Sequence, residues 1–157
     1  MSKQVKPIPD GYHSVTSYLT VKGAADALAF YKRAFDAEEI MRMNGPHGDI
    51  GHAEIKIGDS RVMLSDECPE MQFVGPQTLG GSPVALMLYV PDVDATFARA
   101  IAAGAKERLK VEDKFYGDRS GSLEDPFGHV WHIATHIEDV SEQELMARAK
   151  KFMESQS

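Results

Sequence analysis

Histidine is the residue type that offers the most chemistry in this chain. Six histidines are present, and an imidazole can bind a transition metal or transfer a proton near neutral pH. His132 and His136 share one face of an expected strand, as do His52 and Glu54, because strand side chains alternate with a period of two. Either pair, or His13, could contribute to a metal site. An ordinary polar strand face gives the same pattern without any site.

The single cysteine, Cys68, adds little to this chemistry. One thiol can form neither an internal disulfide nor a thiolate zinc site. Its segment, SDECPE over residues 65–70, is acidic, and nearby carboxylates disfavour a reactive thiolate. We expect Cys68 to be incidental rather than a nucleophile.

Composition and charge restrict the class of protein. The 157 residues suffice for one ordinary domain, and 43% hydrophobic with 26% charged residues is typical of a globular chain. A net charge of −7 argues against nucleic acid and anionic lipid as partners, since both need a basic face. The sequence begins without the apolar run of a signal peptide and lacks a membrane-spanning segment, which predicts a cytoplasmic protein.

The hydrophobic pattern predicts one order of elements twice. Alternation predicts a strand over residues 13–21, a three-to-four spacing predicts a helix over 24–35, and strands are expected over 38–43, 52–57 and 61–65. The order returns as a strand over 84–90, a helix over 93–103, and strands over 106–114, 120–124 and 130–135. Corresponding positions lie 68 or 69 residues apart, as for Val21 and Val90. This spacing indicates an internal duplication, although two unrelated strand–helix units would look similar.

The predicted fold class is α+β, with two βαβββ modules. The first module covers residues 12–68, a Gly- and Pro-rich linker or flap 69–83, the second module 84–136, and a C-terminal helix 137–157. Ser141 and Glu144 form a capping box at the start of that helix. A helix would cover one face of each sheet, so we expect the bare faces to curl into a shared cleft for a ligand. Half-open apolar sheets also favour a homodimer.

Three stretches resemble the glyoxalase/bleomycin-resistance/dioxygenase (vicinal oxygen chelate) superfamily. They are AFYKRAFDA at 29–37, YVPDVDA at 89–95 and EDPFGH at 124–129, within a resemblance that spans about residues 14–136. The last stretch also has a local reason, because Pro126 presets φ in a hairpin turn and Gly128 supplies the positive φ. The further run from Gly117 to His136 is most similar to the PhnB-like branch.

The resemblance implies four places for metal ligands, one on the first and one on the last strand of each module. In this chain those places hold Thr16, Leu64, Ala85 and His132. Leu64 and Ala85 have no donor atom, and one imidazole alone binds a divalent ion weakly. We therefore expect no metal site of the usual kind and no cofactor, while a divalent metal in a rearranged site stays open.

The same strand faces predict the lining of the pocket, which is mostly apolar and suits an organic ligand. Family register points His132 inward as the candidate catalytic residue. Arg119 could clamp a carboxylate bidentately or pair with Asp118 or Asp125 to hold the hairpin. The expected ligand-binding residues are Thr16, Tyr18, Leu64, Ala85, Met87, Tyr89, Phe115, Tyr116 and Arg119.

Three functions fit these observations. The first is a metal-independent protein that binds a small organic molecule, as bleomycin-resistance members do. The second is a lyase, isomerase or dioxygenase of the same superfamily, using His132 as a base or in a nonstandard metal site. The third is a regulatory or structural dimer with a vestigial pocket. The sequence favours the first and leaves open whether the protein is an enzyme.

Overall fold

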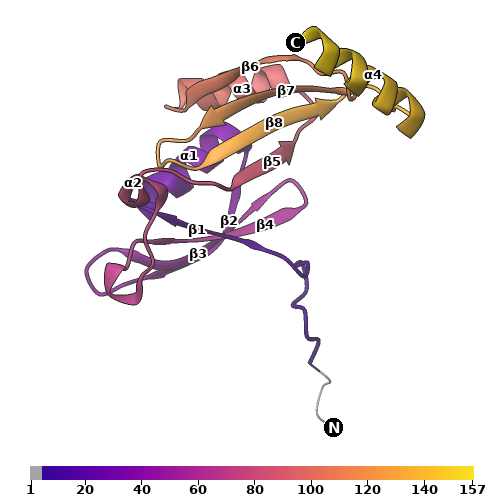
Figure 1. Cartoon of the computed structure of the whole chain (residues 1–157). Coiled ribbons are helices and arrows are strands. Elements are labelled where there is room, and N and C mark those ends of the chain that lie inside the picture. The colour runs from indigo at the N-terminus through magenta and orange to yellow at the C-terminus, as the bar shows by residue number, and fades with distance from the viewer. Residues whose placement is uncertain (1–4) are drawn as a thin grey trace. The chain divides into compact units, whose positions relative to one another are not determined.

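The computed structural model describes residues 5–157, which form two compact units divided between Gly81 and Ser82. Each unit contains one four-stranded mixed sheet (Figure 1). The two units are described separately below. Among residues 5–157, no helix combines the length and apolarity needed to cross a membrane.

The first unit has the predicted order of strand, helix and three strands. Its sheet has the strand order β1-β4-β3-β2, in which β1 and β4 are parallel and the other neighbours antiparallel. Two short helices, η1 and α2, follow the sheet. The elements are β1 (Ser17–Val21), α1 (Ala24–Phe35), β2 (Glu38–Asn44), β3 (Ile50–Ile57), β4 (Ser60–Asp66), η1 (Pro69–Met71) and α2 (Pro76–Leu79).

The second unit repeats this topology. Its strand order is β5-β8-β7-β6, again with the first pair parallel and the others antiparallel. The predicted α+β class with two βαβββ modules is therefore confirmed. The elements are β5 (Ala85–Tyr89), α3 (Val93–Ala102), β6 (Lys106–Asp113), β7 (Asp118–Glu124), β8 (Val130–His136) and α4 (Glu142–Ser155).

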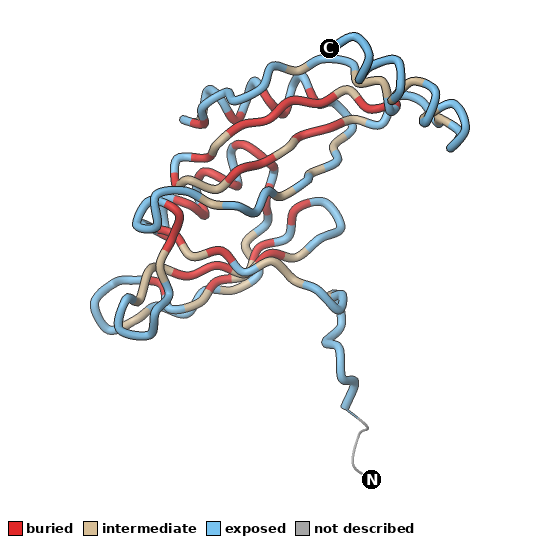
Figure 2. Tube along the Cα trace, viewed as in Figure 1, coloured by how far each residue is buried: buried red, intermediate tan, exposed pale blue. Residues whose placement is uncertain are grey.

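One face of each sheet is covered by a helix and the other is open. Helix α1 contacts all four strands of the first sheet, and α3 contacts β6, β7 and β8 of the second. Buried residues concentrate on the central strands β3, β4, β7 and β8 and on α1 and α3, whereas β2, β6 and α4 have no buried residue (Figure 2). Strand alternation thus separates a core side from an open face, which carries Tyr18 in the first sheet and Met87 in the second.

The two modules also anchor their helices in the same way. Asp66, at the end of β4, accepts hydrogen bonds from the backbone N–H groups of Gly23 and Ala24 at the start of α1. Thr135, near the end of β8, accepts from the N–H of Val93 at the start of α3. In each module the last strand of the sheet, which pairs with the first, supplies a side chain that accepts hydrogen bonds from free backbone N–H groups at the helix N-terminus. The shared anchor supports the predicted duplication.

Several expected strand boundaries differ from the structure; β3, for example, starts at Ile50 rather than at residue 52. Strand β1 starts at Ser17 rather than at residue 13, because its ladder with β4 begins with the pair Ser17 and Val62. Strand β7 starts at Asp118 rather than at 120, since Asp118 pairs with His136. The stretch 69–83, predicted as a linker or flap, contains the two short helices η1 and α2.

Helix α4 begins after Ser141 as expected, but only one of the two hydrogen bonds of the predicted capping box is formed. Ser141 Oγ accepts a hydrogen bond from the Glu144 N–H at 3.2 Å. The Glu144 carboxylate instead accepts from Arg148 Nε at 2.8 Å. Arg148 also binds Glu138 and donates to the carbonyl of Phe115, which ties α4 to the β6–β7 turn.

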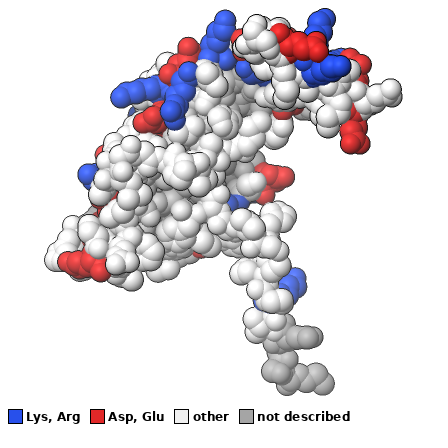
Figure 3. Space-filling model, viewed as in Figure 1, with Lys and Arg blue, Asp and Glu red and all other residues white. Residues whose placement is uncertain are grey.

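Charged side chains of both signs intermix over α3, β6 and α4 on the face shown in Figure 3. The ion pairs of this region follow that mixture, for example Arg148 with Glu138 at 2.8 Å and Lys114 with Glu112 at 2.7 Å. Exposed pairs of this kind fix side-chain positions more than they stabilise the fold.

Candidate functional site

The open face of the second sheet places His132 at its centre. His132 on β8 pairs in register with Met87 on β5 and with Ser122 on β7. Side chains directly opposite one another on neighbouring strands point to the same face. Met87 is 46% exposed on this face, while Trp131 and Ile133, one residue out of phase with His132, are buried on the α3 side.

A groove of about 620 Å³ lies over this face. Its volume falls within the range of sites for small organic molecules. Every lining residue belongs to the second unit. Five of the twelve lining residues are apolar or aromatic, six are polar or charged, and one is glycine. The lining residues are Met87, Leu109, Glu112, Asp113, Lys114, Phe115, Tyr116, Ser120, Gly121, Ser122, His132 and Phe152.

The polar groups at the base of the groove are available to a ligand. Within residues 5–157, the imidazole of His132 and the hydroxyls of Ser120 and Ser122 form no side-chain hydrogen bond. His132 is half-buried, so its ring is held by its neighbours and still reaches the groove. A neutral imidazole offers one donor and one acceptor, and each hydroxyl offers both. A ligand with a hydroxyl or carbonyl group can therefore be bound here.

An aromatic cluster forms the wall of the groove next to α4. The Phe115 ring lies 5.4 Å from Tyr116 in an edge-to-face arrangement and 5.1 Å from Phe152 of α4. Such pairs stabilise one another beyond their burial. Sequence reasoning predicted Phe115 and Tyr116 as ligand-binding residues but missed Phe152. The signal was present, because Leu145, Ala149 and Phe152 form a narrow apolar stripe along the terminal helix.

The charged groups of the lining are held in ion pairs. Lys114 Nζ lies 2.7 Å from Glu112 Oε1, and this hydrogen bond keeps the pKa of Glu112 below its usual value. Asp113 is held by Arg119 Nη1 at 3.0 Å. These carboxylates are therefore already bound to cations.

Tyr89 lies on the open face of the same sheet but outside the groove. Its hydroxyl donates to buried Asp118 at 2.7 Å, and this hydrogen bond raises the pKa of Tyr89. His136 Nδ1 lies 2.8 Å from the other oxygen of Asp118, and His136 Nε2 lies 2.8 Å from Asp139. The hydrogen bonds to these two carboxylates raise the pKa of His136, and the one to Asp118 contributes more than the one to Asp139. Ala85, at the start of β5, is exposed and also lies outside the groove lining.

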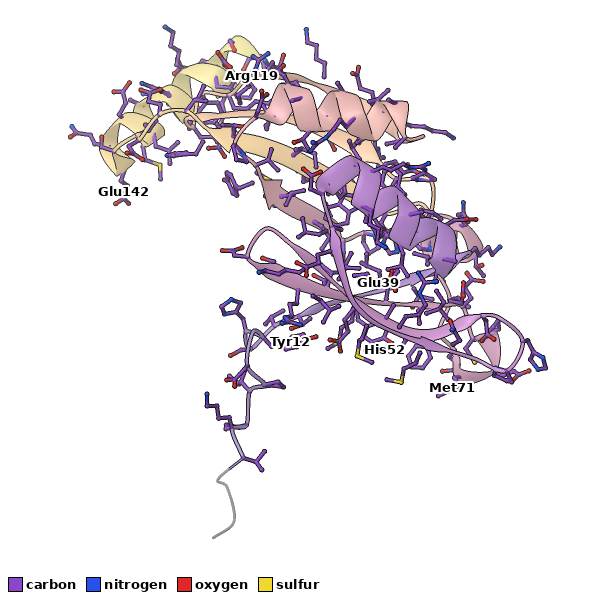
Figure 4. All side chains as sticks on the ribbon, turned by 180° about the vertical axis from the view of Figure 1, so that it is seen from behind. Tyr12, Glu39, His52, Met71, Arg119 and Glu142 are labelled. Atoms are coloured by element: carbon purple, nitrogen blue, oxygen red, sulfur yellow. The ribbon has the colours of Figure 1, made fainter. Side chains whose placement is uncertain are left out.

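Arg119 does not line the groove. Its guanidinium binds both oxygens of Asp94 on α3, at 2.8 and 3.0 Å, and Asp113 on β6 at 3.0 Å. These hydrogen bonds raise the pKa of Arg119. The sequence left Arg119 as either a carboxylate clamp for a ligand or a partner of Asp118 or Asp125. It pairs with Asp94 and Asp113 instead, because Arg119 points to the α3 side of β7 while Asp118 points to the open face. Arg119 ties a helix to an edge strand, and Figure 4 shows it beside α3.

Leu64 was predicted to line the pocket, and the structure contradicts this placement. Leu64 pairs with Leu19 and Ala53, has no exposed surface, and belongs to the core side under α1. Met63, which pairs with Tyr18 and Glu54, occupies the open face instead. A register error of one residue moves a strand side chain to the other face.

The remaining two predicted residues lie in the first unit. Thr16 precedes β1 and is half-buried. Tyr18 is 50% exposed on the open face, and its hydroxyl lies 2.8 Å from Nδ1 of His52. The structure thus brings four predicted residues together in the groove and leaves the others outside it. The four are Met87, Phe115, Tyr116 and His132.

The side chains of the groove do not fit a divalent ion. Throughout residues 5–157, no three His, Cys, Asp or Glu side chains come together as a potential metal site. His132 is the strong ligand of the groove, while Glu112 and Asp113 are paired with Lys114 and Arg119. Transition-metal sites usually need three or more protein ligands.

Comparison with known proteins assigns the family. The chain belongs to the Glyoxalase/Bleomycin resistance protein/Dioxygenase superfamily, whose sequence model matches residues 11–133. The predicted resemblance is therefore confirmed. An uncharacterised protein of Mycobacterium bovis is 42% identical over 137 residues, which cover 85% of this chain and 90% of that protein.

Solved structures show the same fold. A gene product of Arabidopsis thaliana superposes with a TM-score of 0.61 at 28% identity, covering 78% of this chain and 98% of that one. A PhnB protein from Bacillus cereus superposes with a TM-score of 0.63 at 18% identity, covering 78% of this chain and 99% of that one. The latter likeness concerns the fold alone.

Proposed function

We propose that the second unit binds a small, largely apolar organic molecule in the groove, with a polar group of that molecule at His132. The observation that carries this proposal is the combination of an aromatic wall with an imidazole and two hydroxyls that have no side-chain partner among residues 5–157. Apolar sites with a few convergent polar groups are typical of small-molecule binding. The superfamily includes bleomycin-resistance proteins by name, and small-molecule binding in the groove is consistent with that membership.

Binding in the groove is proposed to be independent of divalent metal. Phe115, Tyr116 and Phe152 supply apolar contact area, while His132 and the serines orient the polar group. None of these contacts requires an ion. Removal of divalent ions with EDTA should therefore leave the affinity for an apolar probe unchanged.

The experiment titrates the full chain with the neutral fluorescent probe N-phenyl-1-naphthylamine. The variant Met87→Asp places a carboxylate on the groove wall. The matched control is Met43→Asp, because Met43 also lies on an edge strand, β2, and is 53% exposed in the first unit. Circular dichroism of both variants verifies that they are folded.

We expect Met87→Asp to weaken probe binding about tenfold or more and Met43→Asp to leave it unchanged. An apolar contact of about 1–2 kcal/mol is lost, and about 1.4 kcal/mol corresponds to a factor of ten. Equal affinities of the two variants, or a loss of binding in EDTA, would overturn the proposed function.

A second candidate function is proton transfer by His132 to or from the bound molecule. The observation in its favour is that both ring nitrogens are without a hydrogen-bond partner among the described residues. A positioned imidazole is an effective general base at neutral pH. Incubation of ketones with acidic α-hydrogens in D₂O tests it, with deuterium uptake expected for the wild type and lost in His132→Gln. Uptake that is equal in both proteins would exclude this role.

A further inference from the structure

A chain of hydrogen bonds crosses the open face of the first sheet, outside the groove of the second unit. Tyr18 Oη lies 2.8 Å from His52 Nδ1, and His52 Nε2 lies 3.0 Å from Glu54 Oε1. Glu54 Oε2 in turn accepts a hydrogen bond from Tyr12. Figure 4 shows Tyr12 and His52 on the side of this sheet opposite to α1.

The strand pairing brings these side chains together. Strand β4 lies between β1 and β3, and its Met63 pairs with Tyr18 on one side and with Glu54 on the other. All three side chains therefore share the open face, with His52 two residues from Glu54 on β3. The Tyr18 and His52 rings are 5.5 Å apart and inclined by 43°.

The direction of each hydrogen bond follows from the carboxylate. Hydrogen bonds from Tyr12 and His52 lower the pKa of Glu54, so it is ionised at neutral pH and can only accept. The proton between His52 and Glu54 is then carried by Nε2. In a neutral imidazole this leaves Nδ1 as an acceptor, and it accepts from the hydroxyl of Tyr18.

Glu54 is held firmly enough to orient His52. One of its oxygens binds His52 and the other binds Tyr12, whose ring is covered by the Arg61 guanidinium at 5.1 Å. The side chains of His52 and Glu54 are only 21% and 14% exposed. Tyr18, by contrast, is half exposed, so its hydroxyl can be reached by a molecule in solution.

We propose that Tyr18, His52 and Glu54 form a second reactive site, in which Tyr18 is an acyl-accepting nucleophile toward activated carboxylic esters. A nucleophile bonded to a base that a third group orients is the recurring arrangement of covalent catalysis. His52 is the base, and Glu54 is a positioning residue that stabilises the imidazolium. This inference concerns the first unit and does not depend on the groove of the second.

The step balances without any co-reactant. Tyr18 Oη forms a bond to the ester carbonyl carbon, and its proton passes to His52 Nδ1. The bond between the carbonyl carbon and the leaving oxygen breaks, and that oxygen takes the electron pair. The imidazolium, held by Glu54, then returns its proton to the leaving group or to water.

Tyr12, at the other end of the chain, is not the nucleophile. Its hydroxyl donates to the Glu54 carboxylate. Burial, and after it this hydrogen bond, raises the pKa of Tyr12. A phenol is harder to deprotonate when its hydrogen bond to a carboxylate raises the pKa of the phenol. Tyr18, by contrast, is hydrogen-bonded to the imidazole of His52, which is a base that can take up the proton of the Tyr18 hydroxyl.

The experiment treats the full chain with 4-nitrophenyl acetate and measures acetylation of each tyrosine by peptide mass spectrometry. Tyr89 is the internal control, because it is 58% exposed and its hydroxyl donates to a carboxylate rather than to an imidazole. His52→Gln and Glu54→Gln test the base and the positioning residue. Circular dichroism verifies that the variants are folded.

We expect Tyr18 to be acetylated at least about tenfold faster than Tyr89 in the wild type, since general-base assistance is typically worth a factor of about 10²–10⁴. His52→Gln should reduce the Tyr18 rate to that of Tyr89, and Glu54→Gln should slow it severalfold.

Equal rates for Tyr18 and Tyr89 in the wild type would overturn the proposal without any variant. An unchanged Tyr18 rate in His52→Gln would overturn it as well. Both outcomes are independent of the probe-binding experiment, because neither involves a groove residue.

Discussion

Asp125 is expected to be the most important carboxylate for the stability of the second unit. It is 3% exposed, at the hairpin between β7 and β8. Its Oδ1 accepts from the backbone N–H groups of Phe127 and His129, at 2.9 and 3.0 Å. Its Oδ2 accepts from the indole N–H of Trp131 at 2.9 Å. The perturbations are Asp125→Ala, which removes both oxygens, and Asp125→Asn, which keeps one.

The cost follows from the donors that lose their acceptor. A buried donor without a partner costs about 1–3 kcal/mol. Phe127 and Trp131 are buried, whereas water can reach the N–H of half-buried His129. Asp125→Ala should therefore lower the free energy of unfolding by about 3–5 kcal/mol. Asp125→Asn keeps an oxygen for the two backbone groups but turns its amide toward the indole N–H, so about 1–3 kcal/mol is expected.

Urea unfolding followed by tryptophan fluorescence measures these changes. Trp131 is the single tryptophan of the chain and lies in the second unit, so its emission reports that unit. With an m-value of about 1–1.5 kcal/mol/M, the midpoint of Asp125→Ala should fall by about 2–5 M. Glu107→Ala, an exposed carboxylate on β6, is the control and should shift the midpoint little. The reasoning fails if Asp125→Ala resembles Glu107→Ala, or if Asp125→Asn is as damaging as Asp125→Ala.

Two further predictions concern the ion pairs of the second unit. Asp118 and Asp139 raise the pKa of His136 above its unfolded value, so their stabilisation is complete below about pH 6.5 and is lost as pH rises through the higher folded pKa. The urea midpoint of the wild type should therefore decrease as the pH rises above about 6.5, and His136→Gln should remove this slope; an equal slope in both proteins would contradict the assignment. Arg119→Lys keeps the charge but cannot bind both oxygens of Asp94, so its thermal midpoint should fall by a few degrees. Asp94→Asn should add little to Arg119→Lys in the double variant, and fully additive losses would show that the pair is not coupled.

Much of the fold is predictable from local patterns. The period of two in the strands, the apolar spacing of the helices and the turn residues around Pro126 depend only on neighbours in sequence. Repetition of that pattern predicts two βαβββ modules, and the structure confirms them. The shorter β1 was not predictable, because its start depends on where the ladder with β4 begins.

The residues of the candidate site were predictable only where strand alternation decides on which face of the sheet a side chain lies. Met87 and His132 lie on the open face as their alternation requires, and Phe115 and Tyr116 meet them in the groove. The predicted placement of Leu64 was wrong, because the position assigned to the open face of β4 was off by one residue. Alternation says that neighbours face opposite sides, but the pairing register decides which side is the core.

The amino-acid sequence alone determined the elements, the duplication, the family and the position of His132 on a bare strand face, since each depends on spacing along the chain. Only the tertiary structure decided that Arg119 binds Asp94, that Phe152 closes the aromatic wall and that Tyr18 meets His52. These partners lie 25 to 37 residues apart, and strand register together with helix docking brings them within contact distance. The spacing of residues along the chain does not determine which distant partners meet, because many strand registers place the same residue types on the same face.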